Sequence, residues 1–237
     1  AMVKELREMT GAGMMDCKKA LNETNGNMDE AVEFLRKNGQ AKAEKKASRI
    51  AAEGLCMVVT KDDQTAAVVE VNSETDFVAK NATFQEFVKA VATQAVNSDA
   101  ADMDAFMAEK WNEDASKTVS EALVEKVAVI GENLKIRRFE KVVAEHGCVV
   151  PYVHGGGRIG VIVDADTDVV NDTVKEAMHN IAMQIAALNP KYVSRDEVSA
   201  DYIAHEKEIL LAQIMNDPKE SQKPEKVING MIEGRIS

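Results

Sequence analysis

The chain has few cysteines and no paired cysteine motif. Its 237 residues include three, Cys17, Cys56 and Cys148, and none belongs to a C-x-x-C pair. An odd, widely spaced set argues against a disulfide scaffold and fits a reducing compartment. No apolar stretch approaches the length of a membrane span, and no signal-peptide core opens the sequence. We therefore expect a cytoplasmic protein with no membrane partner; an organelle stays open if a transit peptide was removed.

Basic charge is also scarce, with 29 Lys+Arg against 40 Asp+Glu and a formal net charge of -11. Phosphate binding needs a concentrated basic surface, so this composition argues against direct nucleic-acid binding. Only four prolines and no Ser- or Gln-rich tract are present, and 45% of the residues are hydrophobic. These proportions predict a folded, soluble protein of one large domain or two to three small ones.

The first forty residues predict three short helices. The third begins at Asn27, with Glu30 in capping-box position, and we expect it to end at Asn38-Gly39. The apolar faces expected for the first two helices are Val3, Leu6 and Met9, then Met14, Cys17 and Leu21. Such a small module buries little surface, so it is expected to present a face to a partner. We place it at 1–40, followed by a linker helix at 41–52.

An internal repeat organises the rest of the chain. At one constant offset, the segment 53–59 matches 145–151, 68–71 matches 160–163, and 75–78 matches 167–170. Each copy has the pattern of a strand, a turn, a second strand and a helix. We therefore predict an α+β fold whose duplicated core has two subdomains, 53–140 and 141–237, packed pseudo-symmetrically.

The segments outside the repeat are predicted to be helical. Asp99–Glu140 has apolar residues at helical spacing and breaks at Gly131-Glu132-Asn133. Ser199–Asn216 and Pro224–Arg235 predict a projecting, coiled-coil-like helical hairpin at about 199–236. The helix of the second repeat is expected to bury one stripe, consisting of Val174, Ala177, Met178, Ile181, Ala182 and Ile185.

No catalytic or metal-binding motif is recognisable. His154-Gly155-Gly156-Gly157 resembles an oxyanion-hole sequence, but the chain has no G-x-S-x-G nucleophile elbow, so a hairpin loop is favoured. His146, Cys148 and His154 lack the spacing of zinc ligands. There is no phosphate-binding P-loop motif. We expect no bond-making chemistry, no metal and no cofactor.

The segment Thr75–Val78 leaves two possibilities open. Phe77 could fill the core, with Thr75 or Asp76 capping a turn. Alternatively, Phe77 could be exposed on a loop held by a strand and a helix, as in many protein–protein hot spots.

Two long segments closely resemble the signatures of the translation elongation factor Ts family. They are Leu6–Leu21, LREMTGAGMMDCKKAL, and Glu70–Lys80, EVNSETDFVAK. Gly131–Asn133 with Arg137-Arg138, and His154–Gly160, are also similar to family segments and occur in the expected order. The resemblance covers essentially the whole chain. It implies a guanine-nucleotide exchange factor that binds elongation factor Tu in its GDP-bound and nucleotide-free states, and a ubiquitin-associated-like (UBA-like) N-terminal domain.

The resemblance also implies roles for individual residues. Thr75, Asp76, Phe77 and Val78 would push into the partner GTPase and displace Mg²⁺, with Phe77 as the wedge and Asp76 making polar contacts at its base. A homodimer or a 2:2 complex stays open, as does the alternative of a protein-interaction module without exchange activity. An exposed Phe77 would favour exchange, and a buried one the alternative. The implied docking residues are Arg7, Thr10, Gly11, Ala12, Met14 and Met15 at the GTPase domain, and Gly156 and Gln184 at a more distant domain; family members often have His where this chain has Gln184.

Overall fold

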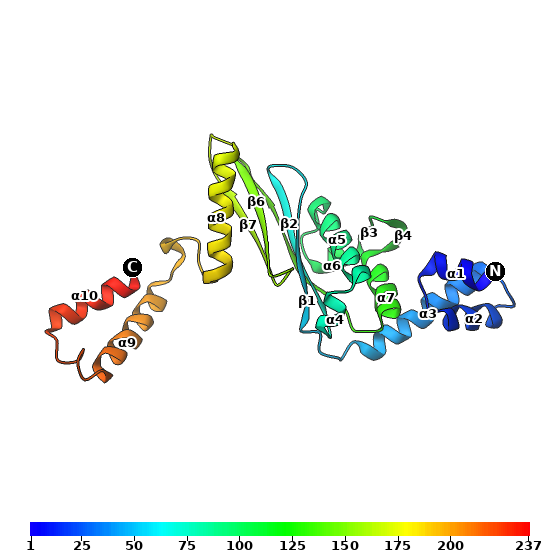
Figure 1. Ribbon diagram of the computed structural model, residues 1–237, viewed down its shortest axis with the longest axis horizontal. Coiled ribbons are helices and arrows are strands. Elements are labelled where there is room, and N and C mark those ends of the chain that lie inside the picture. Colours follow the sequence, from blue (N-terminus) through cyan, green and yellow to red (C-terminus); the bar gives the residue numbers. More distant parts are fainter. The chain divides into compact units, whose positions relative to one another are not determined.

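The computed structural model describes all 237 residues and divides into two compact units, Ala1–Leu188 and Asn189–Ser237. Helices and strands are mixed in the first unit, and the second unit is helical (Figure 1). The predicted α+β class is therefore confirmed. No helix combines the length and the apolar character needed to cross a membrane.

The chain opens with three helices, α1 (Met2–Thr10), α2 (Met14–Glu23) and α3 (Met28–Lys46). The side chain of Asn27 accepts a hydrogen bond from the backbone of Glu30 and so caps α3 as the sequence predicts. Met9 and Met14, which we expected on packed faces, are exposed instead, because the small cluster between the helices does not reach them. The buried members of this cluster are Leu6, Cys17, Ala20, Leu21 and Ala31.

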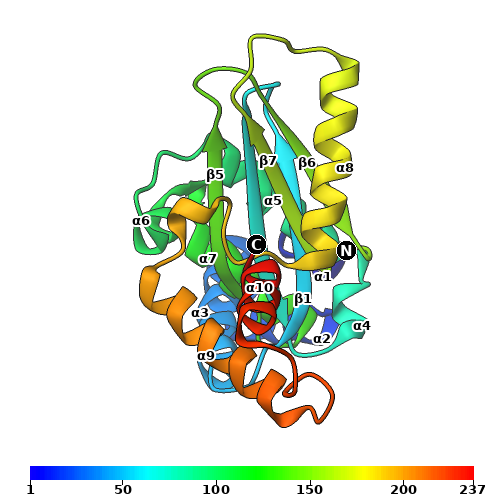
Figure 2. The same ribbon diagram turned by 90° about the vertical axis from the view of Figure 1, so that its left-hand side faces the viewer.

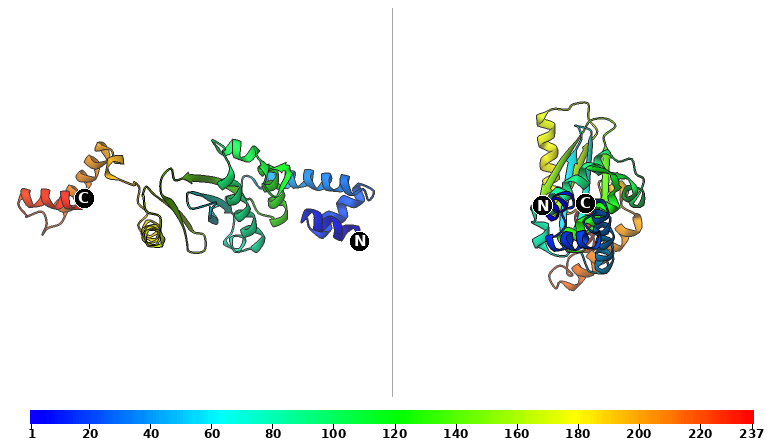
Figure 3. Two further views of the ribbon diagram at one scale, coloured as in Figure 1. Left: turned by 90° about the horizontal axis from the view of Figure 1, so that it is seen from above. Right: turned by 90° about the vertical axis from the view of Figure 1, so that its right-hand side faces the viewer.

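The third helix is longer than expected. The prediction that it ends at Asn38-Gly39 is wrong, since α3 runs on to Lys46. Gly39 is buried, and a Cβ built on it would lie 3.4 Å from the Cβ of Ala128 in α7 (Val119–Ile130). The small residue here allows close helix packing rather than ending the helix. Figure 3 shows α3 leading from the three-helix bundle toward the core; the domain boundaries at 40 and 52 stay predictions.

The first repeat forms an antiparallel hairpin of β1 (Glu53–Thr60) and β2 (Thr65–Ser73), followed by α4 (Asp76–Ala79) and α5 (Ala82–Asn97). β5 (Lys135–Val143) pairs with the other edge of β2, so the sheet order is β1-β2-β5. Helix α5 packs on this sheet (Figure 2). The main core between them includes Val69, Val71, Phe84, Val88 and Val91, all almost fully buried.

The prediction of a helical Asp99–Glu140 is wrong in two places. α6 (Met103–Ala108) and α7 are helices, but β3 (Lys110–Trp111) and β4 (Asp114–Thr118) form a small hairpin between them, and β5 is a strand. Buried Ile136 lies between exposed Lys135 and Arg137, which is the alternation of a strand. Pairing with the distant β2 therefore overrides the local helical pattern.

The second repeat has the same order of elements, with β6 (Cys148–His154), β7 (Ile159–Ala165) and α8 (Asp172–Leu188). Each hairpin begins at a glycine with positive φ, 126° at Gly54 and 110° at Gly147. A Cβ would lie 2.1 Å from the carbonyl oxygen of Val71 at the first, and 2.0 Å from that of Ala165 at the second. Glycine is required at both, because only a residue without Cβ tolerates this approach.

The two hairpins contact each other. The backbone N–H of Cys56 in β1 donates to the carbonyl of Gly157, which lies between β6 and β7, at 2.6 Å. Helix α8 lies along β6 and β7 (Figure 1), but only Met178 and Ala182 of its predicted stripe are buried. Ala177 and Ile181 are exposed, because a two-stranded hairpin covers less of a helix than a three-stranded sheet does.

The second unit contains a short 3-10 turn, η1 (Arg195–Glu197), and the helices α9 (Ala200–Asn216) and α10 (Glu225–Ile236). Ile214 of α9 packs against Ile228 and Ile232 of α10. An ion pair between Lys207 and Glu233, at 2.6 Å, joins the same two helices. The predicted helical hairpin is confirmed.

Candidate functional site

The loop from β2 to α5 is fixed from within. The hydroxyl of buried Ser73 donates to the carbonyl of Thr75 at 2.9 Å. Thr75 is the N-cap of the one-turn helix α4, and its side chain accepts a hydrogen bond from the N–H of Val78. Val78 packs against the main core and Ala79 is buried. The base of the loop is therefore part of the folded core.

Phe77 is presented to solvent from this fixed base, with 80% of its surface exposed. It belongs to α4, whose next two residues face inward. Of the two possibilities that the sequence leaves open, the structure shows the exposed aromatic side chain. Beside it, the ammonium of Lys80 lies 2.8 Å from the carboxylate of Asp76. This hydrogen bond and the charge of Lys80 lower the pKa of Asp76, so its carboxylate is ionised at neutral pH.

A second segment holds the same loop from outside. Glu132, in the turn after α7, accepts hydrogen bonds from the N–H of Glu74 at 3.0 Å and from the N–H and hydroxyl of Thr75 at 3.1 and 2.7 Å. In return, Glu74 accepts the N–H of Asn133 at 2.6 Å. The sequence marks Gly131-Glu132-Asn133 as a helix break and as part of the family resemblance, but it does not indicate what Glu132 binds. One signal for its role is a carboxylate just beyond a helix C-terminus, where the helix dipole favours a cation, so a glutamate there needs other partners.

The predicted N-terminal docking residues lie around the turn between α1 and α2. Gly11 takes a φ of 68° and lets the chain leave α1. Thr10 donates its hydroxyl to the carbonyl of Leu6 and accepts the N–H of Ala12. The side chains of Met14 and Met15 are 58% and 74% exposed, and Arg7 is exposed on α1. The six residues thus run from α1 through the turn into α2, and four of them are exposed while Thr10 and Ala12 are half-buried.

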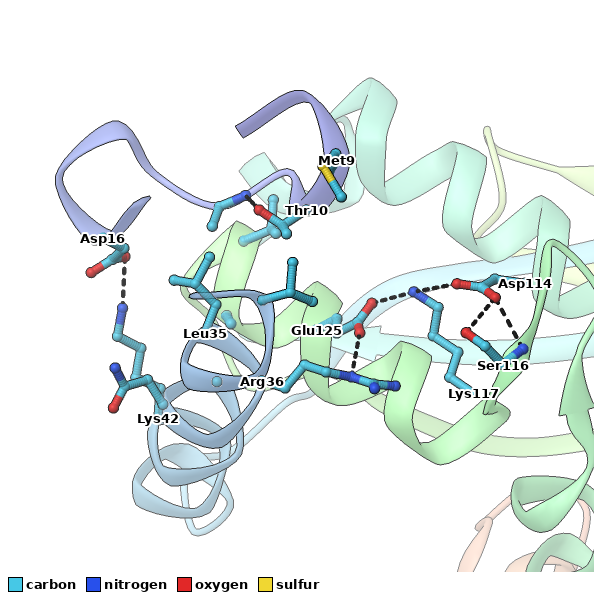
Figure 4. A pocket seen from close by; sticks show the side chains of 16 residues that line it. Met9, Thr10, Asp16, Leu35, Arg36, Lys42, Asp114, Ser116, Lys117 and Glu125 are labelled. Atoms are coloured by element: carbon cyan, nitrogen blue, oxygen red, sulfur yellow. Dashed lines mark hydrogen bonds and ion pairs between the residues drawn. The ribbon is translucent and has the colours of Figure 1, made fainter. Parts of the chain in front are cut away.

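A cavity of about 270 Å³ lies beneath that turn, between α3, α7 and β4 (Figure 4). Its charged wall joins the three-helix module to the core. Arg36 of α3 lies 3.7 Å from Glu125 of α7, and the same carboxylate accepts a hydrogen bond from Lys117. Met9 and Thr10 line the opposite side. The helices on both sides of the α1–α2 turn thus pack on α3, which in turn contacts α7.

Gly156 and Gln184 are both exposed, the first in the β6–β7 loop with a φ of 67° and the second on α8. His146 lies between the carboxylates of Asp166 and Asp168 rather than near His154. No group of three His, Cys, Asp or Glu side chains has an arrangement suited to a metal ion.

Exposed apolar side chains on hydrogen-bonded, well-anchored loops are typical of protein–protein contacts. Phe77 and the methionines after α1 both fit this description, so the site has the form of a binding surface.

Comparison with known proteins identifies the family of the chain. The family model described as Elongation factor TS matches residues 74–237. The chain belongs to the elongation factor Ts family and is a translation elongation factor.

Individual relatives support this assignment over nearly the whole chain. A protein of Clostridioides difficile (strain 630) named Elongation factor Ts is 54% identical over 236 residues, which are 99% of this chain and 77% of that protein. Proteins of the same name from Clostridium novyi and Halothermothrix orenii are each 48% identical over 99% of this chain. The matched regions are 76% and 77% of the lengths of those two proteins.

Proposed function

We propose that this chain is a guanine-nucleotide exchange factor that binds elongation factor Tu and promotes release of GDP. The observation that carries the proposal is Phe77, an aromatic side chain 80% exposed on a loop whose base is buried and hydrogen-bonded. An exposed ring adds nothing to the stability of the fold, whereas burial of such a side chain is worth about 1.5–3 kcal/mol. That free energy becomes available for binding when a partner covers the ring.

In the proposed complex, Phe77 enters the GTPase beside the nucleotide site, and its insertion displaces the Mg²⁺ that the GTPase holds with GDP. The metal belongs to the partner. Bound cations are often the largest charge facing a phosphate, so losing Mg²⁺ loosens the nucleotide. Asp76 is ionised and points from the same turn, so it can accept hydrogen bonds at the base of the wedge.

Exchange then follows from reciprocal coupling. A factor that binds the empty GTPase more tightly than the GDP-bound form must weaken GDP binding by the same ratio. No covalent bond forms or breaks in this step. The factor acts by stabilising one state of its partner, so its rate enhancement depends on differential contacts.

Two further surfaces extend the proposed contact. The turn between α1 and α2 would dock on the GTPase domain, and the β6–β7 loop with α8 would reach another domain of the partner. Because these surfaces and Phe77 belong to one chain, the second contact forms at high effective concentration once the first is made. The docking residues proposed are Arg7, Thr10, Gly11, Ala12, Met14, Met15, Gly156 and Gln184.

The test is release of a fluorescent GDP from elongation factor Tu, followed with the wild type and with Phe77→Ala. We expect strong acceleration by the wild type and a loss of about tenfold or more in the variant, because the wedge is a central hot spot. The control is Val193→Ala, which removes an apolar side chain that is 95% exposed in the second unit. Wild-type protein that binds without accelerating release would favour the interaction module without exchange activity, and an equal loss in both variants would contradict the role of Phe77.

A further inference from the structure

We infer that Glu132 is a positioning residue for the Phe77 loop, acting through the hydroxyl of Thr75. The inference rests on the proposed function for its effect on exchange, and on the hydrogen-bond geometry for its effect on the loop. Glu132 is distant in sequence and its carboxylate is hydrogen-bonded to neither Phe77 nor Asp76, yet it meets three donors of the loop within 3.1 Å.

Helix α4 is too short to be stable by itself. It has four residues, Asp76–Ala79, a single turn. An isolated turn fixes several backbone dihedrals for one hydrogen bond and is unstable in water. Phe77 gives it no packing, because its ring is exposed. Val78 and Ala79 anchor the end of the turn in the core, so the orientation of the ring also depends on what holds the N-terminus of the turn.

Thr75 supplies that hold, and Glu132 sets the direction of its hydroxyl. A threonine hydroxyl has one proton to donate and lone pairs to accept with. Its proton goes to the Oε1 atom of Glu132 at 2.7 Å, which leaves a lone pair for the N–H of Val78 at 3.4 Å. The other carboxylate oxygen, Oε2, accepts the N–H groups of Glu74 and Thr75. An ionised carboxylate satisfies all three donors because both its oxygens only accept.

Glu132→Gln changes this polarity without changing the size of the side chain. If the amide oxygen keeps the two backbone donors, the NH₂ group faces the hydroxyl of Thr75 and donates to it. The hydroxyl then accepts from the amide with one lone pair and from Val78 with the other, and its proton loses the carboxylate that fixed its direction. The loop loses order while the fold around it keeps its packing.

The experiment measures two properties of Glu132→Gln in the full chain. Amide hydrogen exchange of Val78, in the protein alone, reports the cap directly, and we expect it to accelerate roughly tenfold or more, because the capping hydroxyl has lost one charge-assisted hydrogen bond. Titration of the factor in the GDP-release assay separates maximal rate from half-saturating concentration. We expect the maximal rate to fall by a similar factor with little change in half-saturation, because the docking turn is untouched.

Two matched variants complete the design. Glu121→Gln changes a carboxylate at the other end of α7, where it accepts the N–H of Thr118, and should alter neither readout. In a Thr75→Val background, Glu132→Gln should add almost nothing, since the hydroxyl it acts on is gone. Wild-type Val78 exchange in Glu132→Gln, or additive losses in the double variant, would overturn the inference. A wild type that fails to accelerate GDP release would instead sink the proposed function, and the hydrogen-exchange result would still decide the role of Glu132.

Discussion

Gly39 of α3 packs directly against Ala128 of α7, with 3.4 Å between a Cβ built on the glycine and that of the alanine. An alanine fits this space as an ordinary contact, and in a helix interior it is favoured over glycine by about 1 kcal/mol. We therefore expect Gly39→Ala to be neutral or stabilising, and Gly39→Ile to lower the free energy of unfolding by about 1–3 kcal/mol through overpacking. Urea unfolding tests this, and equal stability of the two variants would contradict the close contact.

The ion pair between Lys117 and Glu125 joins β4 to α7, and its lysine side chain is only 18% exposed. Glu125→Gln leaves this ammonium with Asp114 alone, at 3.4 Å. Breaking this partly buried pair should cost more than breaking a surface pair and less than breaking a fully buried one. We expect Glu125→Gln to lower the free energy of unfolding by about 1–2 kcal/mol. The control is Glu8→Gln, which breaks the exposed pair with Lys4 and should change stability little. Similar melting curves for the two variants would show that partial burial adds nothing here.

His146 predicts a dependence of stability on pH. The pKa of His146 is raised above its ordinary value of 6.5. The largest cause is the hydrogen bond between the ring and Asp166, and the charge of Asp166 and a hydrogen bond to Asp168 add to it. The folded state therefore holds the proton more tightly than the unfolded state does. Stability from this group is fully present below pH 6.5 and is lost as pH rises through the raised pKa.

An NMR titration of the ring should give a midpoint above 6.5, and His146→Gln should flatten the fall of stability above that pH. His205→Gln, which removes a histidine with no ion pair, should leave the fall unchanged. A midpoint at or below 6.5 would contradict the prediction.

The three thiols should differ in reactivity. Cys17 and Cys148 are buried, whereas Cys56 is half-buried on β1. Burial, followed by the negative charge of Glu70, raises the pKa of Cys56 and lowers its thiolate fraction. We expect Cys56 to be alkylated first, yet more slowly than free cysteine at the same pH, because the thiolate is the nucleophile. Mass spectrometry of protein labelled at pH 8 identifies the site; initial modification of Cys148 would contradict the order.

Local patterns predicted much of this fold. The capping pair Asn27 and Glu30, the two strand–turn–strand–helix copies and the helical hairpin are all present. The errors fall where distant contacts decide the outcome. Lys135–Val143 looked helical but pairs with β2, and Gly39 looked like a helix end but packs on Ala128. No window of local sequence contains those partners.

The candidate site divides in the same way. The sequence marks Thr75–Val78 as distinctive, yet it leaves the exposure of Phe77 open, because an apolar residue in a short turn can face either way. The role of Glu132 could not be predicted, because its donors are 57 and 58 residues away in the chain. A carboxylate in a turn looks solvated until the fold places unpaired N–H groups beside it.

The hydrogen bond from Cys56 to Gly157 has a consequence for the solubility of the chain. β1 is an edge strand of its sheet, and an open edge can recruit strands from other molecules. The outward-facing N–H of Cys56 on that edge donates to the loop between β6 and β7. Gly160 of β7 lies against Cys56 and Val58 of the same edge strand. The second copy of the repeat thus covers part of the β1 edge, and that part is not free to pair with a strand of another molecule.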